Sequence, residues 1–259
     1  MQNNYSIEPL ISAMNQKNFE IFDNAKVKGN ALLINQCDIE TYEEEYNDGL
    51  RRIFSTRERG LSKSRNLAIK NAKGDICLFV DDDEVLEDGY EKIISDAYDK
   101  FTGADILCFK LKGGRKNYSD KTYRIGFLKS LKICSCQITF KKKSITDKNI
   151  LFDENFGSGT IMGSGEENVF LFDCLKKKLR IYYIPICIAT VAQQNSGWFK
   201  GFDKEYFRKR GAIIRRLMGI VAGTIYVVYF AISKRSMYRR ETRFTDAILE
   251  MMKGLYRGI

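Results

Sequence analysis

The 259-residue sequence contains no histidine. This absence excludes Ser-His-Asp and Cys-His nucleophilic sites, histidine-ligated zinc and histidine general bases. Acid–base chemistry must therefore fall to carboxylates, lysine, tyrosine or cysteine. No two of the seven cysteines form a CxxC pair, which favours reduced core thiols in a cytosolic compartment. Cys134 and Cys136 would share a face of a strand, and a disulfide or metal role for them remains an alternative.

An N-terminal signal segment is also not visible, because Met1–Ser6 is polar and uncharged and no long apolar run follows it. The net charge of +10 is unevenly spread. Residues 198–259 hold fourteen Lys/Arg and five Asp/Glu, a net of +9, whereas the other residues hold 29 and 28, a net of +1. This asymmetry indicates an acidic partner for the tail, either anionic lipid or nucleic acid.

Short apolar runs alternate with helix-like segments through most of the chain. This order predicts βαβ units and a mostly parallel sheet. Ser62 is expected to cap its helix, and Thr41–Asp48 is expected to be an acidic surface loop. The expected strands are Ile7–Met14, Ala31–Asn35, Arg51–Ser55, Ile76–Val80 and Ile106–Leu111, and the expected helices are Ser62–Ala72, Glu91–Phe101 and Glu166–Lys177.

The apolar run Ile76–Val80 stops at three aspartates. Carboxylates at the carboxyl end of a buried strand repel one another unless a cation or charged ligand lies there, and this edge of an open α/β sheet is where ligands bind. If the strand continues, Asp81 and Asp83 lie on one side and could chelate one hard divalent cation, Mg²⁺ or Mn²⁺. The alternative is a solvated acidic turn that precedes a helix.

Two further polar clusters have both a structural and a functional interpretation. Glu166 and Glu167 follow the Gly-rich segment Phe152–Gly165 and open a helix. They either cap that helix or present a general base. Arg65 and Asn66 either lie on a solvated helix face or direct Arg65 at a phosphate or nucleotide.

The C-terminal tail contains a basic helix-like stretch followed by Leu217–Ser233, which has seventeen residues and no charge. At about 1.5 Å per residue this run is roughly 26 Å long, slightly less than a ~30 Å hydrocarbon core. An in-plane or re-entrant membrane helix therefore fits better than a clean span. The alternative is a helix that packs on the rest of the protein. The basic residues flank an apolar run rather than interleaved aromatics, which disfavours nucleic acid.

These pieces, in this order, resemble the family 2 glycosyltransferases, which have the GT-A fold. The motifs that match closely are Gly60–Asn66, which reads Gly-Leu-Ser-x-x-Arg-Asn, and Ala72–Asp75, which reads Ala-x-Gly-Asp. The Asp-x-Asp motif of the family falls on Asp81 and Asp83, and Gly165–Glu167 occupies the place of its base element. The resemblance implies a Rossmann-like, mixed and mostly parallel sheet flanked by helices over residues 1–200, with a helical tail over residues 201–259.

The resemblance also implies inverting transfer of a sugar from a nucleotide-diphosphate donor, UDP-linked, to a hydroxyl of a lipid-linked glycan in capsule or O-antigen synthesis. Asp81 and Asp83 would hold Mn²⁺ or Mg²⁺, and Glu167, with Glu166 beside it, would be the base. The implied donor contacts are Ser12, Met14, Asn15, Asn35, Gln36, Arg65, Asp81 and Asp82, and the implied acceptor contacts are Gly163, Ser164, Gly165 and Trp198. The implied location is peripheral, on the inner face of a bacterial membrane, and an oligomer is left open.

Three positions depart from the family pattern. The usual Asp-Asp after the second strand is Asn35–Gln36, and the base is a glutamate rather than an aspartate. The family's downstream histidine is absent, so that Gln193, Gln194, Asn195 or water would have to replace it as a metal ligand. Two alternatives follow: a haloacid-dehalogenase-like phosphatase, for which Asp81–Val85 has the formal motif, and a membrane adaptor with a degenerate transferase domain.

Overall fold

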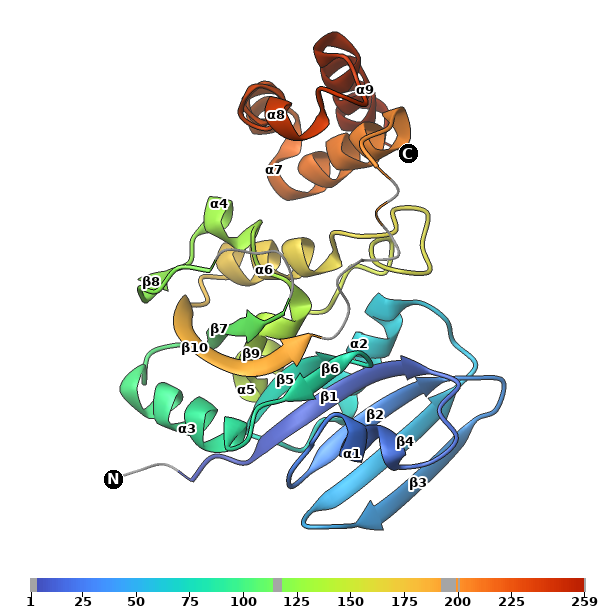
Figure 1. Ribbon diagram of the computed structural model, residues 1–259, viewed down its shortest axis with the longest axis vertical. Coiled ribbons are helices and arrows are strands. Elements are labelled where there is room, and N and C mark those ends of the chain that lie inside the picture. Colours follow the sequence, from blue (N-terminus) through green and yellow to red (C-terminus); the bar gives the residue numbers. More distant parts are fainter. Residues whose placement is uncertain (1–3, 114–117, 192–198, 200, 259) are drawn as a thin grey trace. The chain divides into compact units, whose positions relative to one another are not determined.

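The structure is a computed structural model that describes residues 4–113, 118–191, 199 and 201–258 (Figure 1). The chain divides into two compact units. The first comprises residues 1–159 and 166–195, and the second comprises residues 160–165 and 196–259.

A ten-stranded sheet forms the centre of the first unit, with the order β3-β4-β2-β1-β5-β9-β7-β10-β6 and with β8 paired to β10. Strands β1, β2, β4, β5, β7 and β10 run in one direction. The sheet is therefore mixed and mostly parallel. The strands are β1 Ile7–Met14, β2 Ala31–Gln36, β3 Thr41–Tyr46, β4 Leu50–Thr56, β5 Ile76–Asp81, β6 Glu84–Leu86, β7 Ile106–Lys112, β8 Tyr123–Arg124, β9 Ile138–Lys141 and β10 Ile181–Val191.

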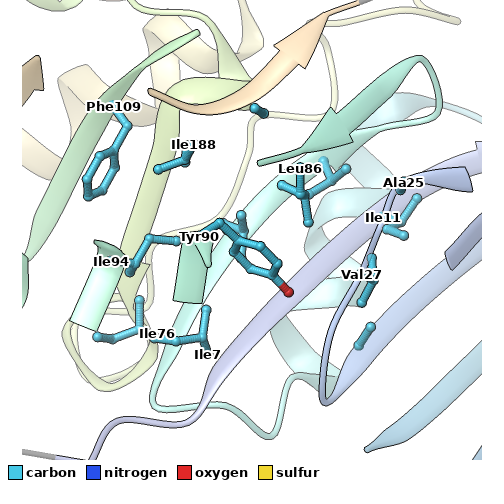
Figure 2. Close-up of a cluster of buried hydrophobic side chains, with 14 of the residues drawn as sticks. Ile7, Ile11, Ala25, Val27, Ile76, Leu86, Tyr90, Ile94, Phe109 and Ile188 are labelled. Atoms are coloured by element: carbon cyan, nitrogen blue, oxygen red, sulfur yellow. The ribbon is translucent and has the colours of Figure 1, made fainter. Parts of the chain in front are cut away.

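Two hydrophobic clusters sandwich this sheet. Along β5, Ile76, Leu78 and Val80 join one cluster, which is drawn in Figure 2, whereas Cys77 and Phe79 join the other. Burial on both faces explains why the strand is a continuous apolar run rather than an alternating one. The helices of this unit are α1 Glu20–Asn24, α2 Leu61–Asn71, α3 Tyr90–Lys100, α4 Phe127–Ser130, the 3₁₀ turn η1 Ser135–Gln137, α5 Lys142–Thr146 and α6 Glu166–Lys176.

The second unit is helical and has a core of its own, built around Phe207, Tyr238 and Met251. Its helices are α7 Lys204–Ser233, α8 Arg235–Tyr238 and α9 Phe244–Arg257 (Figure 1). Helices α7 and α9 cross at two glycines. A Cβ added at Gly211 would lie 1.9 Å from the Met251 carbonyl oxygen, and one added at Gly254 would lie 1.9 Å from that of Arg208. The two backbones therefore touch where no side chain intervenes.

Two local expectations are wrong. Residues 41–46 form the edge strand β3 rather than a loop, and they pair antiparallel with β4. The pairing places Glu44 opposite Arg52 and Glu45 opposite Arg51. Arg51 Nη1 lies 3.5 Å from Glu45 Oε1, so that a cross-strand ion pair helps to hold the acidic run in place. Ser62 does not cap α2: Gly60 is the N-cap residue, and the Ser62 hydroxyl instead donates to the Phe156 carbonyl at 2.6 Å.

Two further expectations placed side chains on strands where the structure has none. Strand β5 stops at Asp81, so Asp82 and Asp83 lie in a turn before β6 and do not alternate along a strand. Cys134 and Cys136 belong to the 3₁₀ turn η1 and its cap and not to a strand. All seven cysteines are free thiols.

Candidate active site

The polar residues predicted at the strand ends share one edge of the sheet. The neighbouring parallel strands β4, β2, β1 and β5 set this edge. Their register places Ser12 opposite Asp81 and Asn35 opposite Ser55. Because these are the carboxyl ends of parallel strands, the edge is the position at which open α/β sheets bind ligands.

Arg65 lies at the centre of this edge and is 1% exposed. One guanidinium nitrogen donates to Asp81 Oδ1 at 2.9 Å, and the other donates to Glu166 Oε1 at 3.0 Å. Burial alone would lower the pKa of Arg65, but the two carboxylates outweigh burial and raise it. The guanidinium also lies 5.8 and 5.5 Å from the ring centroids of Phe79 and Phe152. One permanent charge thus joins α2, β5 and α6.

The helix that carries Arg65 is tied to the Gly-rich segment. Leu61 N–H donates to the Ser158 carbonyl at 3.0 Å. Asn66 exchanges two hydrogen bonds with the Phe152 backbone, at 2.7 and 3.0 Å. Gly157 has φ +100°, and a Cβ there would lie 3.3 Å from Glu166, so glycine allows this segment to pass close to the site. The Gly-rich segment therefore positions Glu166 next to Arg65.

The acidic cluster is built around Asp81. Its second oxygen, Oδ2, accepts from the Cys136 thiol at 3.2 Å. Its backbone N–H donates to Glu84 Oε2 at 3.1 Å, and the other oxygen of this buried Glu84 has no hydrogen-bond partner within the described chain. Partial burial, together with the Asp81 charge, raises the pKa values of both Asp82 and Asp83. The carboxylates of this cluster therefore carry more negative charge than the single positive charge of Arg65 can neutralise.

The donor chemistry of this cluster fits a hard divalent cation that is shared with a phosphate-bearing ligand. Within the described ranges, no group of three His, Cys, Asp or Glu side chains gathers to hold a metal alone. Mg²⁺ is commonly held by one or two carboxylates plus substrate phosphates and water rather than by an all-protein cage. Asp83 offers such a carboxylate, and Asp81 lies two residues before it.

Glu167 follows Glu166 at the start of α6. Burial, and then the charge of Glu166, raise the pKa of Glu167 to about 8, although Arg65 acts in the opposite direction. Cys134 adds a smaller upward contribution to this pKa. A carboxylate whose pKa lies close to neutral pH is suited to general base catalysis.

The predicted donor contacts have different positions in the structure. Arg65 was expected to face phosphate or nucleotide, but it is buried between carboxylates because their charges compensate its own. Asn35 is also buried: it accepts from Gln16 N–H at 2.9 Å and donates to Ser55 Oγ at 3.1 Å.

The remaining predicted donor contacts are either hydrogen-bonded within the protein or exposed. Gln36 Oε1 accepts from Gly60 N–H at 2.7 Å, and Ser12 accepts from Ser64 Oγ at 2.8 Å. These side chains join loops of the sheet edge to one another. In contrast, Met14 and Asn15 are exposed where β1 ends.

The predicted acceptor contacts fall in the second unit or outside the described residues. Gly163, Ser164 and Gly165 belong to the segment 160–165 of the second unit. A Cβ added at Gly165 would lie 3.0 Å from Ile213 Cδ1, so this segment packs on α7. Trp198 and the candidate metal ligands Gln193, Gln194 and Asn195 lie outside the described residues.

Sequence reasoning missed Cys136 and Glu84 as members of the site. Cys136 reaches Asp81 from a turn 55 residues further along the chain, and no local pattern signals this contact. Glu84 differs, because it directly follows the three aspartates. Its position at the start of a short strand could have suggested burial behind the cluster.

Comparisons with known proteins concern the family and the fold. The model of the family Glycosyl transferase family 2 matches residues 38–163, a range that includes Arg65 and the aspartates and ends just before Glu166. A comparison with curated protein sequences gives no match.

Solved structures with a similar fold include those of TarS from S. aureus. The TarS 1-349 complex with UDP-GlcNAc matches with a TM-score of 0.62 at 15% identity and covers 96% of this chain and 83% of that one. The complex with UDP matches with the same score and identity and covers 97% and 81%. The predicted fold is thereby confirmed: a mixed, mostly parallel GT-A-like sheet with flanking helices and C-terminal helices.

Proposed function

We propose that the protein is an inverting glycosyltransferase that moves a sugar from a nucleotide-diphosphate donor to an acceptor hydroxyl. The observation that carries this proposal is the buried Arg65, which joins Asp81 at the end of β5 to Glu166 at the start of α6. It brings the acidic cluster and the base-bearing helix into one network. The match to Glycosyl transferase family 2 over residues 38–163 supports the same assignment.

A UDP-linked sugar is the donor class that we propose. Support comes from TarS, whose similar structures are complexes with UDP-GlcNAc and with UDP. In this protein Met14 and Asn15 are exposed at the end of β1 and leave this part of the edge open to a ligand. Asn35 and Gln36 serve the same edge indirectly, because their hydrogen bonds hold its loops.

The reaction requires one proton acceptor and one means of offsetting charge on the leaving group. The acceptor hydroxyl loses its proton to Glu167 while its oxygen bonds to the anomeric carbon. The bond from that carbon to the diphosphate oxygen breaks, and the diphosphate leaves with the electron pair. Mn²⁺ or Mg²⁺, held by Asp83 with Asp81, would offset the charge on the diphosphate. Arg65 fixes Asp81 and Glu166 in place throughout.

The acceptor that we propose is a lipid-linked saccharide at the inner face of a bacterial membrane, in the assembly of a surface polysaccharide such as capsule or O-antigen. Support comes from the charge distribution, since residues 198–259 carry a net charge of +9 and anionic lipid attracts such a segment. The acceptor loop 160–165 belongs to the same compact unit as this segment. A protein acting on a membrane-borne substrate gains from both features.

The two alternative activities have less support. A phosphatase of the haloacid-dehalogenase type would use Asp81 as its nucleophile, but the glycosyltransferase family model matches residues 38–163, a range that includes Asp81. A degenerate adaptor would have no need of a carboxyl group such as Glu167, whose pKa is raised to about 8 by burial and by the charge of Glu166. Both observations favour glycosyl transfer.

The test is sugar transfer and UDP release from a panel of UDP-sugars with Mn²⁺, measured for the wild type and for Asp83→Ala and Glu167→Gln. We expect each substitution to reduce turnover by roughly 10²–10⁴-fold, as for the loss of a positioned acid–base group or metal ligand. Asp88→Ala is the matched control, because its side chain is 90% exposed and lies beyond the cluster. Full activity in either site variant, with the fold intact, would overturn the assignment.

A further inference from the structure

The second half of α7 carries a stripe of exposed apolar side chains. Val221, Ile225, Val228 and Ile232 are spaced by four, three and four residues, so they lie on one face of the helix. Val221 is 81% exposed, Ile225 is 71% and Ile232 is 62%. The opposite face of the helix is buried, since Val227, Phe230 and Ala231 pack in the core of the unit. The stripe is therefore not part of that core.

A contiguous exposed apolar face of this kind marks an interaction surface. Tyrosines border it: Tyr229 is exposed, and the Tyr256 hydroxyl lies 3.3 Å from the Thr224 hydroxyl. Tyrosine is enriched where one end of a side chain is apolar and the other is wet, as at a membrane–water interface. The composition of the border thus favours a bilayer surface.

Four exposed basic residues follow the stripe along the chain. Lys234, Arg239, Arg240 and Arg243 are exposed and follow the end of α7. Among the described residues none of these four forms an ion pair, whereas Arg208 in the first half of the helix is paired with Glu250 at 2.6 Å. Basic side chains beside an apolar face complement anionic phospholipid head groups.

The geometry of α7 favours a helix that lies in the membrane plane. By length and composition Lys204–Ser233 could cross a bilayer. However, Gly219, with φ 73° and ψ −173°, interrupts the helix. The apolar half that remains, residues 220–233, is about 21 Å long at 1.5 Å per residue. This length is below the ~30 Å of a hydrocarbon core, and one face of the half-helix is committed to the protein core.

We propose that the stripe Val221, Ile225, Val228 and Ile232 is an in-plane docking surface for an anionic phospholipid bilayer. The segment 160–165 packs on Ile213 of the same unit, so docking carries this loop to the bilayer surface. That the docking serves acceptor capture rests on the proposed function. The docking itself depends only on the stripe and its basic border.

The test is co-flotation of the full-length protein with vesicles of phosphatidylglycerol and phosphatidylcholine, compared with pure phosphatidylcholine. The variant Val221→Ser/Ile225→Ser/Ile232→Ser removes apolar area without touching the core. We expect its partition coefficient onto anionic vesicles to fall by roughly 100-fold. The matched control is Ile39→Ser/Leu151→Ser, which alters two exposed apolar residues of the first unit and should partition like the wild type.

Three outcomes would overturn the proposal. The first is equal partition of the Ser variant and the wild type. The second is wild type that fails to bind anionic vesicles at low salt. The third is a vesicle-free dimer that the Ser variant converts to a monomer, which would make the stripe an interface between two copies. Transfer to a soluble acceptor, measured on the same samples, reports separately on the proposed function. Vesicle binding without any sugar transfer would support the docking surface and contradict the proposed glycosyltransferase activity.

Discussion

The sheet edge and the C-terminal unit differ in how their charged side chains are buried and paired. At the sheet edge Arg65 is buried, and each of its two terminal nitrogens has a carboxylate partner. In the C-terminal unit, apolar side chains such as Val221 are exposed, and Arg239 and Arg240 have no acidic partner among the described residues. A buried charge needs its partners inside the protein. An exposed apolar and basic face needs a partner outside it. The ion pairs of Arg65 are satisfied within the protein, whereas the exposed face of the C-terminal unit is completed by another surface.

The strongest way to break this contrast is to remove the buried cation. Arg65→Met leaves Asp81 and Glu166 without their partner, and we expect the free energy of unfolding to fall by about 3–5 kcal/mol. Chemical denaturation measures this loss. Lys92→Met is the control: the side chain of Lys92 is 74% exposed and pairs with Asp96 one helical turn away, so the variant should lose about 1 kcal/mol or less. Equal losses in the two variants would contradict the contrast.

The second prediction concerns pH and Glu167. As a base Glu167 must be ionised, and its pKa is raised to about 8 by burial and by Glu166, with Arg65 opposing and Cys134 adding to the shift. We therefore expect kcat/KM to rise roughly tenfold per pH unit below that pKa and to level off above it. Initial rates from pH 6 to 9 measure the profile, and a flat profile over this range would count against Glu167 as the base.

The same raised pKa makes a prediction about stability that does not involve activity. The folded state holds the Glu167 proton more tightly than the unfolded state, so this contribution to stability is fully present below the unfolded pKa of about 4.3. It is lost as the pH rises through the folded value of about 8. Glu167→Gln should accordingly lose less stability than the wild type between pH 5 and 8, as measured by denaturation at each pH.

A smaller effect on stability is expected at the close crossing of α7 and α9 in the C-terminal unit. Gly254→Ala introduces a Cβ 1.9 Å from the Arg208 carbonyl oxygen, so α7 and α9 must separate. We expect a loss of about 1–3 kcal/mol in the stability of this unit, followed by circular dichroism and limited proteolysis. Gly126→Ala is the control, because an added Cβ there meets nothing within 4 Å. If Gly254→Ala were neutral, the close helix crossing would not hold the unit together.

The smallest effect concerns one basic residue of the border. Arg240→Gln should weaken binding to anionic vesicles by about 1 kcal/mol, roughly fivefold, and the effect should fade at high salt. Lys143→Gln, which alters an 88% exposed lysine of the first unit, should leave binding unchanged. A salt-independent loss in Arg240→Gln would show that the arginine acts through packing rather than through charge.

The sequence predicts the sheet edge well where the signal is local. Strand β5 ends in aspartates, and α6 begins at Glu166 after the Gly-rich segment, as expected. Edge strand β3 was missed because Glu45 in its acidic run pairs with Arg51 of the next strand, a contact that composition alone does not reveal. The direction of Arg65 was missed for a similar reason, since its partners are 16 and 101 residues away along the chain.

The sharing of Arg65 has a consequence for how such a sequence can vary. A change at Asp81 alters how much positive charge remains for Glu166, and a change at Glu166 does the same for Asp81. The two carboxylates lie far apart in sequence, yet neither can be substituted without altering the environment of the other. We therefore expect Asp81 and Glu166 to covary among related sequences. A neutral residue at one position should be tolerated only where the other carboxylate, or Arg65 itself, is also substituted.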